Sequence, residues 1–133
     1  MIINTDKTKS ILITGKRIEN KLPSDTSMAL AIKLDDTKID QVSCQKLLGV
    51  ILDANLNYEA HIDHLCKKLS KQLGLLKHIS TYLKRRQRET YFNGVIKPTL
   101  MYRSVIWDCC GVESLTRVLK LQKRAARIIL DTE

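Results

Sequence analysis

The hydrophobic pattern of this 133-residue chain changes period near Asn57. Beyond that point the apolar residues recur at spacings of three and four, which places them on one face of a helix. The members of this stripe are Tyr58, Ile62, Leu65, Leu69, Leu73, Leu76 and Ile79. Before it, short apolar or alternating segments are bounded by polar turns, as strands are. The change predicts an α+β fold, in which a small antiparallel sheet is followed by a three-helix bundle.

Four segments before residue 54 have the length and composition of strands. They are residues 9–14, 28–34, 39–43 and 47–52. The last is a continuous apolar run, and we expect it to form one strand. Residues 15–27 are predicted to form a loop, and Asp35-Asp36-Thr37 a turn.

Three signals divide the helical part. Asn57 is a plausible N-cap for the first helix, and a second helix is expected to begin near Arg85. Pro98 lacks an N–H group, so it is expected to kink or restart that helix and leave residues 99–107 as a separate helical arm. Gly111 then breaks the chain before a last amphipathic helix.

The formal charge of +9 is unevenly distributed. Residues 67–103 hold ten Lys or Arg residues against one acid, Glu89, whereas the segments on either side are nearly balanced. An excess of this size favours an anionic partner, and a phosphate backbone is the commonest one. A solvated, Lys-rich helical face is the alternative, and an acidic membrane surface is a weaker one because bulky apolar anchors are few.

No run of about 18 apolar residues is present, so no membrane-spanning helix is expected. The first residues are not expected to form a signal peptide, because Lys7 is not followed by an apolar segment. We therefore expect an intracellular protein, with the choice between nucleus and cytoplasm left open.

The cysteines and three aromatic residues are predicted to be structural. The cysteines (Cys44, Cys66, Cys109 and Cys110) show no disulfide framework and are expected to be reduced thiols. The aromatic residues (Phe92, Tyr102 and Trp107) occur at helical spacing among aliphatic residues, which favours the core over base stacking.

No constellation for a free-standing enzyme can be assembled. His61, His64 and Cys66 suggest zinc, but Cys66 points away from the two histidines on a helix. Asp35-Asp36 is more simply a turn between strands than a magnesium site, because no further carboxylate from a separate strand precedes it. Neither a catalytic triad nor a glycine-rich phosphate loop is present.

Five motifs occur in a fixed order along the chain. They are Asn4-x-x-Lys7-Thr8, Lys46-x-Leu48-Gly49-Val50-x-Leu52-Asp53, His61-Ile62, Tyr91…Ile96-x-Pro98-x-Leu100-x-Tyr102…Trp107, and Leu115-x-x-x-Leu119-x-x-Gln122-x-Arg124-Ala125-x-Arg127-Ile128. Together they resemble the junction of palm and thumb in reverse transcriptases of LINE-type (non-LTR) retrotransposons. Leu47 stands where the family usually has an aromatic residue.

The resemblance implies that residues 1–53 are the end of a polymerase palm and residues 54–133 a helical thumb. In the family the metal-binding Asp-Asp pair precedes the Asn-x-x-Lys-Thr segment, so Asp35-Asp36 is not that pair. The catalytic carboxylates, the fingers and most of the palm are therefore expected outside this chain. Mg²⁺ is expected only for the intact RNA-directed DNA polymerase, a nucleotidyltransferase, and this chain alone is expected to be inactive.

The resemblance also assigns residues to roles. Lys7 matches a lysine thought to protonate the leaving pyrophosphate, and Lys46, Leu48, Gly49 and Val50 match the primer grip. The phosphates of a template–primer duplex are expected to contact the basic residues Lys67, Lys68, Lys71, Lys84, Arg85, Arg86 and Arg88. The alternative is a domesticated, non-catalytic helical module that binds nucleic acid or a protein partner.

Overall fold

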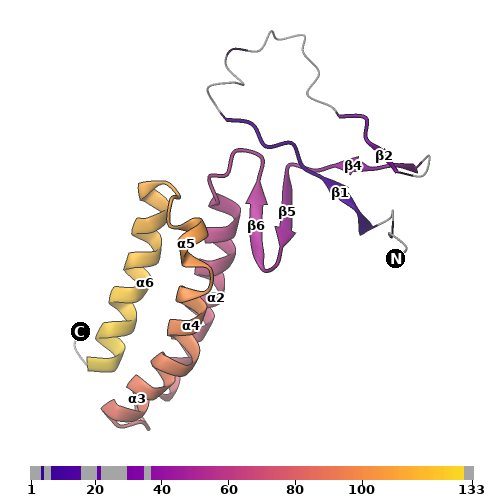
Figure 1. The fold of residues 1–133 in the computed structure, drawn as a ribbon. Coiled ribbons are helices and arrows are strands. Elements are labelled where there is room, and N and C mark those ends of the chain that lie inside the picture. The colour runs from indigo at the N-terminus through magenta and orange to yellow at the C-terminus, as the bar shows by residue number, and fades with distance from the viewer. Residues whose placement is uncertain (1–3, 5–6, 16–20, 22–29, 35–36, 131–133) are drawn as a thin grey trace. The chain divides into compact units, whose positions relative to one another are not determined.

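The computed structural model describes residue 4 and residues 7–15, 21, 30–34 and 37–130. The chain divides into two units, Met1–Leu56 and Asn57–Glu133, which are drawn in Figure 1. Strands make up the regular structure of the first unit and helices that of the second, so the α+β prediction is confirmed.

The described residues of the first unit form three pairs of short strands. The parallel pair is β1 (Lys9–Ser10) with β4 (Asp40–Gln41), and the antiparallel pairs are β2 (Lys33–Leu34) with β3 (Thr37–Lys38) and β5 (Cys44–Leu47) with β6 (Val50–Asp53). The prediction of one antiparallel sheet is thus corrected in detail. Part of the predicted strand 28–34, most of the predicted loop 15–27, and Asp35 and Asp36 lie outside the described residues.

The predicted strand 47–52 is wrong, because the chain reverses within it. Leu48 and Gly49 form a two-residue turn with φ values of 48° and 89°, and Leu47 pairs with Val50 across the resulting hairpin. Two consecutive positive φ values match the twist of a hairpin, but such turns usually begin with Asn or Asp. The apolar Leu48 therefore concealed the turn within the hydrophobic run.

The strands of the first unit have little core beneath them. Among its described residues only Ile39 and Val50 are buried, with exposed fractions of 7% and 2%. A hydrogen bond from Val42 N–H to Ser10 O extends the β1–β4 pair, and another, from Thr14 N–H to Ala54 O, joins the segment after β1 to the residue after β6. The predicted strands 9–14 and 39–43 adopt strand structure over only two residues each, Lys9–Ser10 and Asp40–Gln41.

Residues 57–130, the described part of the second unit, form six helical segments. They are α2 (Glu59–Ser80), α3 (Arg85–Tyr91), the π-helical turn η2 (Phe92–Ile96), α4 (Lys97–Met101), α5 (Ser104–Trp107) and α6 (Val112–Leu130). The predicted stripe of α2 is its buried face, on which Leu69, Leu73 and Leu76 are at most 1% exposed. The helix begins two residues after Asn57, whose Oδ1 accepts a hydrogen bond from Glu59 N–H at 3.4 Å.

The helix that contains Pro98 does not break at that residue. Instead, α3, η2 and α4 follow one another without a gap, and Lys97 N–H donates to Phe92 O in the wide turn before the proline. A wide turn of this kind accommodates a residue that cannot donate a backbone hydrogen bond. The break comes at Arg103, with φ of 52°, and α5 begins after it, so the predicted arm 99–107 is divided.

Polar contacts and buried side chains both attach α6 to the rest of the bundle. Arg117 Nη1 lies 2.6 Å from Asp63 Oδ1 of α2, and Arg88 Nη1 of α3 donates to Ile128 O at 3.1 Å. Val118 and Ala125 bury the inner face of α6, with exposed fractions of 5% and 1%. As predicted, Gly111 precedes this helix, and its carbonyl accepts the Leu115 N–H at 3.1 Å.

Candidate nucleic-acid interface

The basic residues of α2 lie away from the bundle core. Lys67, Lys68 and Lys71 are all exposed, whereas Leu69 between them is 1% exposed. The period of 3.6 residues separates the two faces, because the apolar stripe occupies one side of the helix. The structure therefore leaves these three ammonium groups available to a partner in solvent.

A second group of cations lies at the start of α3. Lys84, Arg85 and Arg86 are exposed, and the Lys84 N–H donates to Gln87 Oε1 at 2.9 Å, which caps the helix. Arg85 Nε lies 3.0 Å from Glu89 Oε1 in an exposed ion pair. Such pairs contribute only about 0–1 kcal/mol, so an incoming phosphate can compete for the guanidinium.

Arg88 does not belong with the other predicted phosphate contacts. It is 9% exposed, and its guanidinium donates to three backbone carbonyls: Ser80 O at 3.1 Å, Leu83 O at 3.0 Å and Ile128 O at 3.1 Å. These carbonyls lie at the ends of α2 and α6 and in the loop before α3. Arg88 holds the helix ends together, and we exclude it from the interface.

The last helix carries basic residues that the sequence analysis missed. Lys120, Lys123, Arg124 and Arg127 are exposed, and the sole acid of α6 is Glu113 in its first turn. The charge count over residues 104–133 concealed them, because it averaged the middle of the helix with acids near both ends. A count restricted to residues 117–127 would have found five cations and no acid.

The primer-grip-like residues of the first unit are placed by the β5–β6 hairpin. Lys46 is exposed on β5, and Leu48 at the turn is 68% exposed. Gly49 adopts φ of 89°, a conformation that other residues rarely adopt. Val50 is 2% exposed and therefore anchors the hairpin, so Lys46, Leu48 and Gly49 are the members of this set open to a partner.

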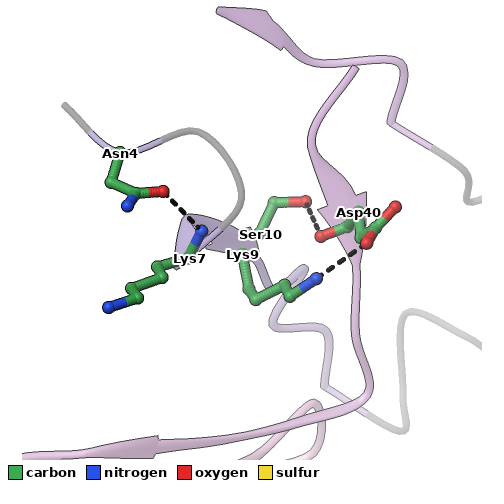
Figure 2. Close-up of polar contacts among 5 residues, drawn as sticks. All are labelled: Asn4, Lys7, Lys9, Ser10 and Asp40. Carbon is green, nitrogen blue, oxygen red and sulfur yellow. Dashed lines mark hydrogen bonds and ion pairs between the residues drawn. The ribbon is translucent and has the colours of Figure 1, made fainter. Parts of the chain in front are cut away.

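Lys7 lies in a hydrogen-bonded loop before β1 (Figure 2). Its N–H donates to Asn4 Oδ1 at 3.3 Å, and Thr8 Oγ1 donates to Asn4 O at 2.8 Å. The Lys7 side chain is exposed and extends away from the other labelled residues. Asn4, Lys7 and Thr8 are thus joined by local hydrogen bonds, and the Lys7 ammonium group is exposed to solvent.

The β1–β4 pair next to this loop is joined by side chains as well as by backbone (Figure 2). Lys9 Nζ lies 2.7 Å from Asp40 Oδ2, and Ser10 Oγ donates to Asp40 O at 3.2 Å. The hydrogen bond and the positive charge of Lys9 hold the pKa of the Asp40 carboxyl below its ordinary value. Lys9 is therefore engaged within the fold, unlike Lys7.

The described cysteines and histidines of the second unit are not grouped as metal ligands. Within the described part of the chain, no three His, Cys, Asp or Glu side chains are grouped so that they could hold a metal ion. Burial raises the pKa of the Cys66 and Cys110 thiols, which are therefore protonated near neutral pH. His64 is exposed while His61 and Cys66 are buried, so the three do not meet at one point.

Several residues of the family-like motifs belong to the core. Ile62, Ile96 and Leu100 are at most 8% exposed, and the His61 and Trp107 rings lie 6.2 Å apart between centroids. Burial, followed by the nearby charge of His64, lowers the pKa of His61. Trp107 Nε1 donates to Tyr102 O at 3.1 Å, which satisfies the indole. These positions stabilise the bundle.

Of the three aromatic residues predicted to be core, Trp107 is buried and Phe92 is half-buried. Tyr102 is instead 51% exposed, and the Arg103 guanidinium lies 5.4 Å from its ring centroid. The prediction therefore holds for Trp107 and is wrong for Tyr102.

None of the described helices is both long enough and apolar enough to cross a membrane.

Comparison with known proteins connects this chain to transposon polymerases of Drosophila melanogaster. A probable RNA-directed DNA polymerase from transposon BS is 33% identical over 104 residues, which cover 75% of this chain and 11% of that protein. The corresponding protein from transposon X-element is 25% identical over 135 residues, which cover 98% of this chain and 14% of that protein. No protein-family model and no solved structure matches the chain.

Proposed function

We propose that this chain, which belongs to the RNA-directed DNA polymerases of LINE-type transposons, acts as a nucleic-acid-binding part of such a polymerase. The order of its motifs predicted this family. In this proposal residues 1–53 are the end of the palm, and residues 54–133 are the thumb. The partner is a template–primer duplex of RNA and DNA. The chain spans only about a tenth of the length of these relatives, so the fingers and most of the palm would lie outside it.

The observation that carries the proposal is the exposure of two groups of cations, one on α2 and one at the start of α3. The exposed members are Lys67, Lys68, Lys71, Lys84, Arg85 and Arg86. Between residues 67 and 103 the sequence has only one acid, Glu89. Lys and Arg contacts to phosphates give affinity without reading the base sequence. That property suits a polymerase, which must move along any template.

The catalytic step would depend on residues outside this chain. Mg²⁺ would activate the attacking hydroxyl and offset charge on the phosphates, and the described residues offer no site for it. Lys7 is the one residue here with a proposed chemical role, that of protonating the leaving pyrophosphate. The exposure of the Lys7 side chain and the hydrogen bond from Lys7 N–H to Asn4 Oδ1 support this role.

The proposal is tested by removing the α3 cations and measuring duplex affinity by fluorescence anisotropy. The triple variant Lys84→Ala, Arg85→Ala, Arg86→Ala is expected to bind an RNA–DNA duplex at least roughly tenfold more weakly, because it loses up to three phosphate contacts. Arg88 is kept in this variant, since its side chain supports the fold.

The matched control removes three exposed cations of the first unit, in the variant Lys21→Ala, Lys33→Ala, Lys38→Ala. Both variants lose the same net charge, so a non-specific charge effect would weaken them equally. Equal affinities of the two variants would contradict the proposal.

A second candidate function is binding of a protein partner, which a groove of the bundle with exposed apolar side chains at and beside it favours. The groove has a volume of about 290 Å³ and is lined by Leu100, Met101, Ser104, Trp107, Asp108, Leu115, Val118, Leu119 and Gln122. Met101 beside it is 60% exposed, and Val105 on α5 is 93% exposed. Binding at such a surface would depend little on salt, whereas phosphate contacts weaken steeply as salt rises.

A further inference from the structure

The helices α2 and α6 lie side by side and run in the same direction (Figure 1). Polar contacts connect them near both ends. Near their first turns, the Asp63 carboxylate of α2 pairs with Arg117 of α6 at 2.6 Å. Near their last turns, Arg88 donates to both the Ser80 and Ile128 carbonyls, at 3.1 Å each. The exposed residues between these two ends therefore form neighbouring rows.

The row on α2 begins at the residue that contacts α6. Asp63, Lys67, Ser70, Gly74 and Lys77 follow one another at spacings of four, three, four and three, so they share one side of the helix. All five are exposed. Since Asp63 contacts α6, this row borders that helix.

The row on α6 begins at the partner of Asp63. Arg117, Lys120, Arg124 and Arg127 follow at spacings of three, four and three, and all are exposed. Beyond the Asp63–Arg117 pair, none of the described residues of either row is acidic. We call Lys67, Lys77, Lys120, Arg124 and Arg127 the α2–α6 basic face.

Gly74 lies in the middle of the α2 row without a packing reason. A Cβ atom built at this position meets no atom within 4 Å, so the fold does not require glycine there. Glycine inside a helix costs roughly 0.5–1 kcal/mol relative to alanine. Its effect is to leave the helix backbone uncovered between Lys67 and Lys77, where a ligand can approach closely.

We propose that the α2–α6 basic face is a second contact surface for the phosphate backbone of a nucleic-acid duplex, in addition to the α3 cations. From Lys67 to Lys77 the row is about 15 Å long, which corresponds to roughly four phosphates of one strand. The cations of the face make no ion pair with any other described residue. Their charge is therefore available to an anion.

The face favours duplex over single-stranded nucleic acid. Proteins that bind single strands combine cations with aromatic side chains on which bases stack. No aromatic residue occurs in either row, and α6 contains none at all. A surface with cations alone contacts backbone without reading bases, which predicts sequence-independent duplex binding. This inference rests on the proposed function, because both require nucleic acid as the partner.

The test compares duplex affinity in two variants of the full chain. In the first, Lys120→Ala, Arg124→Ala, Arg127→Ala, we expect a loss of roughly tenfold or more and a slope of log K against log salt that is less steep by about 2 to 3. In the second, Gly74→Glu, we expect a similar direction of effect, because the carboxylate repels phosphate and covers the exposed backbone. Its control, Gly74→Ala, should bind nearly as the wild type does.

Thermal unfolding separates these losses from unfolding of the protein. Gly74→Glu and Gly74→Ala should melt at or above the wild-type temperature, since both residues favour helix over glycine. Wild-type affinity and salt slope in the Lys120, Arg124, Arg127 variant would overturn the inference. If the α3 variant still lost affinity in that case, the proposed function would stand without this face. Absence of duplex binding by the wild-type chain would overturn both, and tighter binding of a single strand would overturn the preference for duplex.

Discussion

The two units differ in how much of their structure their own residues can support. The second unit buries a continuous apolar stripe on α2. An ion pair joins α6 to α2, and a hydrogen bond from Arg88 of α3 joins α3 to α6. In the described part of the first unit, only Ile39 and Val50 are buried, and most strands are two residues long. Because burial of apolar surface supplies most of the free energy of folding, we expect the helical unit to be much the more stable.

The largest effect is expected from a core truncation in the helical unit. Leu69→Ala should lower the free energy of unfolding by about 2–5 kcal/mol, because it removes a side chain that is 1% exposed and leaves a cavity. Chemical denaturation followed by circular dichroism measures the change. Leu75→Ala, at a position 52% exposed on the same helix, should cost far less. Equal losses would mean that α2 does not pack by this face.

A loss of about 2–4 kcal/mol is expected for Arg88→Ala, because three carbonyl oxygens lose a charged donor and the helix ends lose their link. The same denaturation experiment applies. Arg86→Ala, two residues away and exposed, should leave stability nearly unchanged while it weakens duplex binding. If Arg88→Ala weakened binding without loss of stability, Arg88 would belong to the interface after all.

A smaller, stabilising effect is expected in the first unit. Leu48→Asn should stabilise the β5–β6 hairpin by up to about 1 kcal/mol, because Asn readily adopts the positive φ of 48° found there and Leu does not. Amide hydrogen exchange should then slow at β5 and β6 and stay unchanged in α2. Unchanged exchange at the hairpin would argue against this turn.

The smallest effect concerns pH. The pKa of His61 is lowered in the folded chain, chiefly by burial, so the unfolded state binds the proton more readily. Stability of the helical unit should be constant above the ordinary pKa of about 6.5 and should fall as pH decreases from there toward the lower folded value. Thermal melts in a pH series test this, and His61→Phe should flatten the dependence. A wild-type melting temperature that rises on acidification would contradict it.

The helices could be predicted from the sequence because the spacing of apolar residues that indicates a helix is local and repeats along it. The period of the apolar residues identified the buried face of α2, and Gly111 marked the start of α6. The hairpin at Leu48-Gly49 was missed because an apolar turn residue gives no signal, and the turn is visible only through its φ angles. The parallel pairing of β1 with β4 joins residues about 30 positions apart, which a local pattern cannot reveal.

The candidate interface could be predicted only in part, because the burial of some cations depends on residues distant in the sequence. Charge density identified Lys67, Lys68 and Lys71, but it could not distinguish Arg88, whose burial depends on carbonyls from α2 and α6. Conversely, Lys120, Arg124 and Arg127 became part of a surface only once α6 was seen to lie beside α2. The order of the motifs supplied the family, which charge and periodicity alone could not.

The decisive experiment for nucleic-acid binding by this chain is the salt dependence of its affinity for a duplex. Six exposed cations on α2 and α3 predict that log K falls with log salt with a slope of about −5, and the α2–α6 basic face would make it steeper. A slope near zero, or no measurable affinity for an RNA–DNA duplex at low salt, would contradict the account of this chain as a nucleic-acid-binding part of a polymerase.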